Sequence, residues 1–295
     1  MTVFSNEKKT DFAIKTIDRR FPVPGQMSAR TLFLFLWAAD TVWSWFARQK
    51  PRHTVSCETL SIVIPTRNEE AFIKRCIQAV VGNPCVCEVI VVDAASHDRT
   101  QSLAQQAGAR VLVHDRPIEN GGGRGGQIKA GIDLAMGDVV AVVHADTLLP
   151  GTEIERLMNV LNRYPDIIGG AVGCRFDAPH RRYRVIELAN DLRAAILKIS
   201  FGDQVQFFRR VPVVSRNLFP DMPIMEDVEF SIRLHRLGRR TFLFGNALAS
   251  TRRWEKIGNK NAAWVIKNVA IFLFRRLVER PDTARVYQRY YGSGK

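Results

Sequence analysis

Short apolar segments alternate with helical segments between residues 60 and 144, and this alternation limits the fold more than any other feature of the chain. The apolar segments Leu60–Pro65, Glu88–Asp93, Arg110–His114 and Val139–His144 are rich in valine and isoleucine. Strands that are β-branched throughout are typical of a parallel sheet whose two faces are both covered. The sequence therefore predicts an α/β domain with a mainly parallel sheet and helices on both faces.

Helical periodicity fills the stretches between these strands and continues beyond them. Helices are expected over 69–81, 100–107, 126–136, 153–164, 181–198, 226–237 and 264–278, and further strands over 167–176 and 204–209. Thr66 and Glu69 have the spacing of a capping box at the first helix. The helix over 181–198 is amphipathic, and an apolar stripe ordinarily faces the core. Its stripe consists of Val185, Leu188, Leu192 and Ala195.

The positive charge of the chain is concentrated at one end. The formal net charge is +14, with 9 basic against 11 acidic residues in 51–150 and 26 against 14 in 151–295. A basic half beside a near-neutral half suits a phosphorylated ligand or an anionic membrane surface. The sequence has no recognition-helix, RNP-type or zinc-finger signature, so nucleic acid is not an expected partner.

The cysteines and the first 58 residues bear on location. Five scattered cysteines in a chain of 295 residues indicate a reducing compartment, and therefore a cytoplasmic protein. Residues 1–58 read as a polar leader followed by an apolar helix over Thr31–Ala47, which contains three tryptophans and Asp40. Two interpretations stay open: an N-terminal helical extension packed on the core, or a peripheral anchor on a membrane surface.

Polar motifs follow the predicted strands at the edge where parallel α/β sheets bind ligands. Pro65 precedes Thr66-Arg67-Asn68-Glu69, and the second strand ends at Asp93, which could bind a ribose or a base or simply cap a loop. The fourth strand leads into His144-Ala145-Asp146-Thr147. A carboxylate there is well placed to hold Mg²⁺ or Mn²⁺ against a diphosphate.

Two further motifs precede predicted helices. Gly121-x-Gly123-x-x-Gly126 matches the dinucleotide fingerprint but follows the third strand instead of the first, and Gln127 stands where a P-loop has lysine. What remains is an anion-tolerant loop with Arg124 at a helix start. Met225-Glu226-Asp227 begins another helix, whose dipole favours an ionised Asp227, as a general base requires; plain capping is the alternative.

In this order the motifs resemble glycosyltransferase family 2, whose members have the GT-A fold. The matching segments are SIVIPTRNEE (61–70), VIVVDAASHDRT (89–100), VVHADTLLP (142–150) and PIMEDVEFSIRLHRLG (223–238). The chain looks most similar to a compact subgroup, the radical-SAM/selenodomain-associated transferases, at 123–127, 144–147, 202–204, 225–227 and 252–255. The similarity covers about 59–290, divided into a nucleotide-binding half (59–150) and an acceptor half (151–290).

The resemblance implies a role for each matching residue. Pro65, Arg67, Glu69 and Asp93 would line the nucleotide pocket, and Asp146 would hold the divalent metal. Asp227 would be the general base of an inverting, single sugar transfer from a UDP- or GDP-linked donor. The residues that would support the diphosphate are Arg124, Arg252 and Arg253. The acceptor is not identified, and a lipid-linked acceptor is one candidate.

Two departures from the family pattern keep alternatives open. His144 replaces the first aspartate of the usual D-x-D, and Ser250-Thr251-Arg252-Arg253-Trp254 replaces Q-x-x-R-W, which argues against a processive synthase. The alternatives are a nucleotidyltransferase of similar fold, a dinucleotide-binding oxidoreductase using the glycine loop, and a non-catalytic, membrane-peripheral nucleotide-sugar-binding protein.

Overall fold

The computed structural model describes residues 57–252, 255, 260–278, 283 and 287. The chain divides into two compact units, Met1–Arg52 and His53–Lys295, and all described residues belong to the second. The expectations for the leader, for Thr31–Ala47 and for Arg253 lie outside the described residues.

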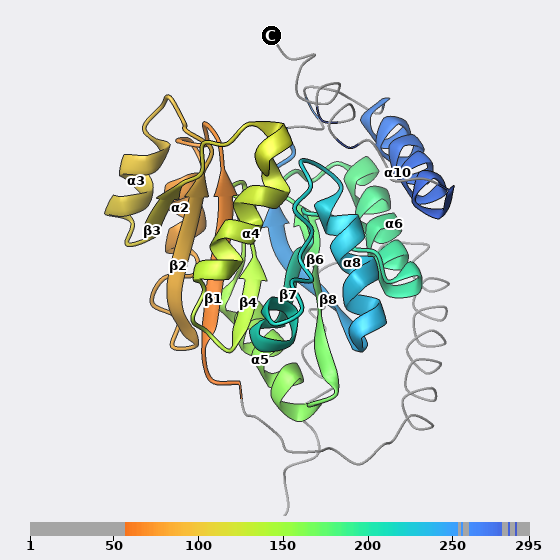
Figure 1. Ribbon diagram of the computed structural model, residues 1–295, viewed down its shortest axis with the longest axis horizontal. Helices are drawn as coiled ribbons and strands as arrows, with labels where there is room; N and C mark the ends of the chain where they lie inside the picture. Colours follow the sequence, from red (N-terminus) through yellow and green to blue (C-terminus); the bar gives the residue numbers. More distant parts are fainter. Residues whose placement is uncertain (1–56, 253–254, 256–259, 279–282, 284–286, 288–295) are drawn as a thin grey trace, which may run out of the picture. The chain divides into compact units, whose positions relative to one another are not determined.

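The first half of the described chain forms a parallel sheet. Its strands are β1 (Leu60–Thr66), β2 (Val86–Asp93), β3 (Arg110–Val113) and β4 (Val139–Val142), in the spatial order β3-β2-β1-β4. They alternate with α2 (Ile73–Gln78), α3 (Thr100–Gln106), η1 (Ile118–Asn120) and α4 (Arg124–Leu134), as Figure 1 shows. Because all four strands run in one direction, their carboxyl ends lie at one edge of the sheet.

The second half extends the same sheet with strands of both directions, because β7 and β5 run antiparallel to the strands beside them. Its strands are β5 (Thr147–Leu148), β6 (Ile167–Phe176), β7 (Val205–Arg209) and β8 (Arg239–Ala249), and the order β4-β7-β6-β8-β5 completes eight strands. Strand β7 is antiparallel to both β4 and β6, whereas β6 and β8 are parallel. The helices are α5 (Gly151–Arg163), α6 (Arg181–Leu197), α7 (Arg210–Val214), α8 (Glu226–Leu237) and α10 (Lys260–Val278).

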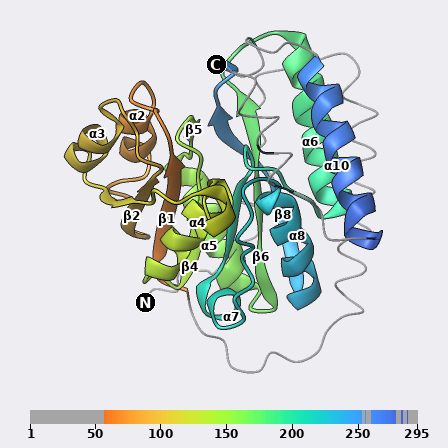
Figure 2. The ribbon, with the colours of Figure 1, turned by 45° about the horizontal axis from the view of Figure 1, so that its top comes forward.

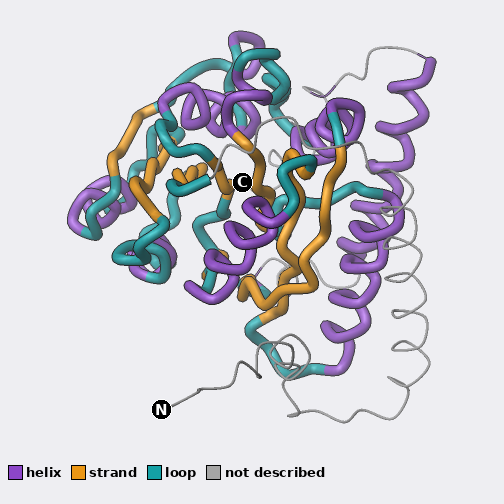
Figure 3. Tube along the Cα trace, turned by 90° about the horizontal axis from the view of Figure 1, so that it is seen from below, coloured by secondary structure: helices purple, strands orange, loops and turns teal. Residues whose placement is uncertain are grey.

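Helices cover both faces of the sheet, as predicted. Alternate residues of β1 point to opposite faces, so Ile62 and Ile64 join one core cluster and Val63 joins the other. The first cluster lies under α2, α3, α5 and α6, and the second under α4, α7 and α8. Figure 3 shows the strands between these helices. The expected α/β fold class is confirmed, with a mixed sheet in which the parallel part is the first half.

Several predicted details are wrong. Thr66 does not cap a helix: it ends β1, its hydroxyl donates to Asp93 at 3.1 Å, and α2 begins only at Ile73. Strand β8 was not predicted, although it begins directly after the stop signal at Gly238. Its place beside β6 depends on partners about 70 residues earlier in the chain, which no local pattern reveals.

The apolar stripe predicted on α6 faces outward. Val185 is 68% exposed and Leu188 is 45% exposed, whereas the face that packs on the sheet carries Tyr183, Glu187 and Asp191. Buried carboxylates need partners. Here Glu187 accepts the backbone N–H of Phe176 at 2.7 Å, and Asp191 binds Arg175 at 2.9 Å. Tertiary hydrogen bonds therefore override the helical pattern.

Helix α10 packs its inner side on the start of α8. Phe272 is buried in a small cluster with Met225 and Val228, and Arg276 binds Glu229 at the end of the contact. Within the described part of the chain, none of the helices combines the length and the apolar composition needed to cross a bilayer.

Candidate active site

The polar motifs gather at the edge of the sheet where β1, β2 and β4 end. Thr66 is paired with Asp93 in the last register of β1 and β2, and Asp146 follows the end of β4. Strand β7 begins at the same edge, because Gln206 pairs with Val142. The segment before β7 and the start of α8 therefore meet the loop that carries Asp146.

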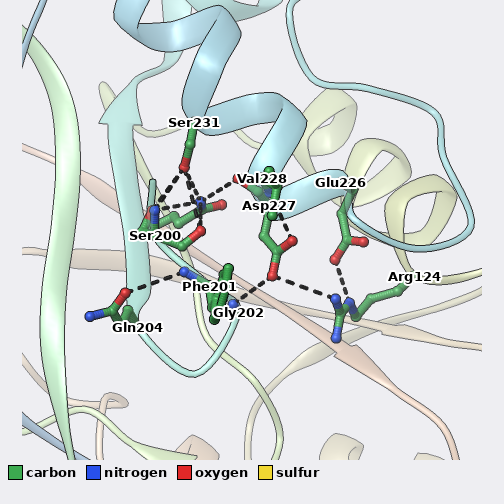
Figure 4. A network of polar contacts seen from close by, with 10 residues as sticks. Arg124, Ser200, Phe201, Gly202, Gln204, Glu226, Asp227, Val228 and Ser231 are labelled. Carbon is green, nitrogen blue, oxygen red and sulfur yellow. Dashed lines mark hydrogen bonds and ion pairs between the residues drawn. The ribbon is translucent and has the colours of Figure 1, made fainter. Parts of the chain in front are cut away.

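Gly202 joins the two carboxylate-bearing segments. Its N–H donates to Asp227 Oδ2 at 2.7 Å (Figure 4), and a Cβ on Gly202 would clash with the ring of His144. Glycine is needed for such a close approach. Burial raises the pKa of Asp203, and the charges of Asp227 and Asp146 add to this effect. Asp227 and His144, which stands two residues before Asp146, therefore both border Gly202.

Asp227 lies in the first turn of α8, and donors engage both of its carboxylate oxygens. Oδ1 accepts the N–H of Val228 at 2.8 Å, and Oδ2 lies 3.7 Å from Arg124 Nη2. The preceding Met225 has a left-handed backbone with φ 65°, an unfavourable conformation for a side chain of this size. The Asp227 side chain is 12% exposed.

Glu226 is a buried partner of the site that the sequence did not reveal. Arg124 Nε donates to Glu226 Oε1, so one guanidinium pairs with both Glu226 and Asp227 (Figure 4). Burial raises the Glu226 pKa to about 7, and the neighbouring Asp227 charge adds to this effect, while Arg124 opposes it. Oε2 is buried without a hydrogen-bond partner.

The glycine loop before α4 contacts the segment Met222–Pro223, which precedes α8. The N–H groups of Arg124 and Gly125, at the start of α4, donate to the carbonyls of Pro223 and Met222 at 3.3 and 3.0 Å. A Cβ on Gly123 would lie 2.7 Å from Pro223 Cα. These two N–H groups are therefore engaged within the chain, which argues against the diphosphate and dinucleotide interpretations of the loop backbone.

Gln127 explains the rest of this motif. Its side-chain amide is buried, and Nε2 donates to the carbonyls of Thr66 and Val92, both at 2.9 Å. The glutamine therefore ties together the ends of β1 and β2. From the sequence it could be recognised only as a missing P-loop lysine.

Glu69, Asp146 and Arg252 lie together, because Arg252 pairs with both carboxylates. Arg252 Nη2 lies 2.9 Å from both carboxylate oxygens of Glu69 and 3.5 Å from Asp146 Oδ2. Its guanidinium also stacks on the Phe72 ring, 4.6 Å from the centroid. Among the described residues, no group of three histidine, cysteine or acidic side chains forms a ready metal cage.

The other predicted nucleotide contacts differ in how far a ligand can reach them. Arg67 is exposed, whereas Pro65 is buried inside β1. Asp93 is fully buried, and its carboxylate accepts four hydrogen bonds: from the Thr66 hydroxyl, from the N–H and the hydroxyl of Ser96, and from the Gln101 amide. Of the two interpretations of Asp93, the arrangement favours the loop cap.

A buried polar network holds the segment before β7. Gln206 Nε2 donates to the hydroxyls of Ser200 and Ser231 at 2.8 and 3.2 Å, and to the carbonyl of Asp227 at 3.1 Å. The Ser200 N–H donates to the Ser231 hydroxyl at 3.1 Å (Figure 4). These residues fix Gly202 beneath α8, and no short motif announces them.

The family description Glycosyl transferase family 2 matches residues 61–216, more than half of the chain. The chain belongs to this family, and its α/β sheet agrees with the GT-A fold that the resemblance implied. A curated relative is the undecaprenyl-phosphate 4-deoxy-4-formamido-L-arabinose transferase of Pseudomonas aeruginosa, 29% identical over 161 residues that cover 52% of this chain and 48% of the relative. An uncharacterised glycosyltransferase of Mycobacterium bovis is 30% identical over 113 residues, covering 38% and 48%.

The chain spans about half the length of these curated relatives. Among solved structures, glucosyl-3-phosphoglycerate synthase from Mycobacterium tuberculosis, in complex with Mn²⁺, UDP and phosphoglyceric acid, aligns with a TM-score of 0.48 at 25% identity, over 65% of this chain and 69% of that one. Staphylococcus aureus TarS aligns with a TM-score of 0.49 at 16% identity, covering 65% and 60%.

Proposed function

We propose that the chain is a metal-dependent, inverting glycosyltransferase that moves a sugar from a UDP- or GDP-linked donor to an acceptor hydroxyl in a single transfer. The observation that chiefly supports this is the position of Gly202, which binds Asp227 and packs on His144, two residues before Asp146. A base and a metal-binding carboxylate close to each other would suit a direct displacement at the sugar carbon.

Asp227 is the proposed general base. Its carboxylate would take the proton of the acceptor hydroxyl while the hydroxyl oxygen forms a bond to the anomeric carbon and the bond to the diphosphate oxygen breaks. The Gly202 and Val228 N–H groups hold the two carboxylate oxygens in position, and Arg124 lies 3.7 Å from one of them. Arg252 is the proposed positive contact of the diphosphate.

Asp146 is the residue that fits the proposed Mg²⁺ or Mn²⁺. Such an ion is usually held by one or two carboxylates together with substrate phosphates, so a cage of three protein ligands is not required. The metal would neutralise the charge of the departing nucleoside diphosphate. Arg252 pairs with Asp146 in the structure, and it would have to share this carboxylate with the ion.

We further propose that the chain belongs to the compact radical-SAM/selenodomain-associated subgroup. The internal contacts of Gly123, Arg124 and Gln127 support this, because they give each fixed residue of that motif a physical reason. A cytoplasmic protein with a lipid-linked acceptor, peripherally associated with the membrane through Thr31–Ala47, is the matching proposal for partners and location.

Removing the proposed base tests the reaction. The change Asp227→Asn should lower kcat about 10²–10⁴-fold, the usual contribution of a general base, while UDP or GDP binding in calorimetry stays within about twofold. Asp133→Asn, on the exposed side of α4, is the control and should behave like the wild type. Near wild-type turnover by Asp227→Asn would show that Asp227 is not the base.

The metal role has a separate readout. Asp146→Ala should lower Mn²⁺-dependent binding of UDP or GDP in calorimetry about tenfold or more, because a hard cation loses its proposed carboxylate ligand. Asp115→Ala, an exposed aspartate near β3, is the matched control. Undiminished Mn²⁺-dependent binding would reject Asp146 as the metal ligand.

A further inference from the structure

Helix α6 exposes apolar side chains that a helix ordinarily buries. Val185, Leu188 and Ile196 are 68, 45 and 53% exposed and lie on one side of the helix, while the opposite side is buried. The reversed orientation is fixed by the partners of its two acids, Glu187 and Asp191. The contacts of these two acids therefore keep the apolar side of α6 exposed.

Helix α10 repeats this arrangement next to α6. The two helices lie side by side in Figures 1 and 2. Phe272 is buried, but Phe274 is 66% exposed and Ile271 is 38% exposed. We name as the α6–α10 surface the exposed apolar residues Val185, Leu188, Ile196, Leu197, Ile271 and Phe274. They are more than half of the large exposed apolar residues in the described part of the chain.

The exposed charged residues that the structure describes on α6 and α10 have one sign. Both acids of α6 are buried and paired with arginines, and the sequence of α10 contains no acid. The exposed charged residues described on the two helices are cationic: Arg181, Arg182, Arg184, Lys267 and Arg275. Exposed apolar side chains on helices with exposed cations match the headgroup region of an anionic bilayer, which accepts apolar groups and attracts positive charge. A protein partner would need no such uniform sign.

The α6–α10 surface adjoins the acceptor side of the proposed site. Helix α6 ends at Leu197, five residues before Gly202, whose N–H binds Asp227. The inner side of α10 places Phe272 against Met225 and Val228, the residues that flank the Glu226–Asp227 pair. A bilayer docked on these helices would lie beside the carboxylate that accepts the proton.

We propose that the α6–α10 surface docks on an anionic lipid bilayer and so brings a membrane-borne acceptor to Asp227. The second clause rests on the proposed function, whereas the docking itself does not. The surface is distinct from Thr31–Ala47, and it uses side chains that the sequence pattern assigned to the core.

Vesicle binding tests the docking without any sugar transfer. The full chain is sedimented with vesicles of phosphatidylcholine, with and without phosphatidylglycerol. The wild type should bind the anionic vesicles and lose most of this binding in about 1 M salt, because screening shortens the reach of the cations. The triple change Val185→Ser, Leu188→Ser and Phe274→Ser should weaken binding about tenfold or more, since three apolar side chains no longer enter the interface.

A matched control uses apolar residues at the other edge of the sheet. Met136 and Val211 are 70 and 62% exposed and follow α4 and β7, near the amino end of β1. The double change Met136→Ser and Val211→Ser should leave vesicle binding unchanged. All variants are compared by thermal unfolding, so that a misfolded sample is recognised.

Three outcomes would overturn the docking. The first is a wild type that does not bind anionic vesicles. The second is a triple variant that binds like the wild type, which would assign the contact to another part of the chain such as Thr31–Ala47. The third is a control variant that loses as much binding as the triple variant. Calorimetry with UDP, GDP and Mn²⁺ on the same samples reports on the proposed function separately, so either proposal can fail alone.

Discussion

The two halves of the described chain treat carboxyl groups in opposite ways. In the first half, residues 59–150, burial of Asp98 and Asp138 is outweighed by hydrogen bonds from backbone and threonine donors, and the pKa of each is lowered. In the second half, residues 151–290, burial raises the pKa of Asp191 to about 6 and that of Glu226 to about 7. Glu229, which Arg276 and Arg233 hold, is the exception.

The difference follows from how each half is assembled. Parallel strands and covering helices complete the first half with apolar contacts, and Asp98 and Asp138 lie in the loops before α3 and β4. The second half turns β7 against β4 and packs α6 and α8 through buried acids and arginines. We infer that buried acids and arginines hold the second half together, and that its free energy of unfolding should therefore depend on pH.

The largest effect is expected at the strand that joins the halves. Phe208 on β7 is fully buried and contacts Phe230 edge to face at a centroid distance of 4.9 Å. Phe208→Ala should lower the free energy of unfolding by about 3–5 kcal/mol in urea titrations. Phe274→Ala, at an exposed position, should change it by less than about 0.5 kcal/mol. A small loss in Phe208→Ala would mean that the halves share no common core.

Glu226 tests whether the free energy of unfolding depends on pH through the second half. An acid with a folded pKa of about 7 and an ordinary value of 4.5 binds more protons when folded between these limits, so stability falls as the pH rises through them. The wild type should lose about 2–3 kcal/mol of unfolding free energy from this group between pH 5 and 8. Glu226→Gln should flatten that slope, as urea titrations at several pH values would report.

The control for this slope is Glu155→Gln on the exposed side of α5, which should leave it unchanged. If the free energy of unfolding depended on pH equally in the wild type and in Glu226→Gln, buried Glu226 would not be the source of the pH dependence expected for the second half.

Gln127 tests how much the buried hydrogen bonds between β1 and β2 stabilise the first half. Gln127→Ala leaves the carbonyls of Thr66 and Val92 without their common donor, and should lower the free energy of unfolding by about 1–3 kcal/mol. Gln105→Ala, exposed on α3, serves as the reference with an expected change below about 0.5 kcal/mol. Equal values for the two variants would show that the tie between β1 and β2 is dispensable.

The smallest effect is expected on the outer side of α6. Leu188→Ser should change the free energy of unfolding by less than about 0.5 kcal/mol, because its side chain is already half exposed. Leu157→Ser on α5, at a fully buried position, should cost about 2–5 kcal/mol. A large loss in Leu188→Ser would restore the core-facing stripe that the sequence predicted and would contradict the α6–α10 surface.

Prediction from sequence worked best where a local pattern coincides with the final environment. Strands β1, β2 and β3 begin and end within two residues of their expected bounds, and β6 and α8 match them. The same reasoning failed for α6, because its period marks an apolar side without saying which side packs. It gave Glu226 and Gln127 no role, because each acts through a partner that lies about 60–100 residues away in the chain.

The amino-acid sequence by itself determined the order of the four parallel strands and which motif residues stand near strand and helix ends, because short-range periodicity and turn chemistry depend on neighbouring residues. The order of its motifs carried the resemblance to the family. Only the tertiary structure decided the strand order, the outward side of α6, the sharing of Arg124 between Glu226 and Asp227, and the meeting of Gly202 with His144. Each of these depends on contacts between distant segments, and desolvation within such contacts sets the charge of a carboxyl group.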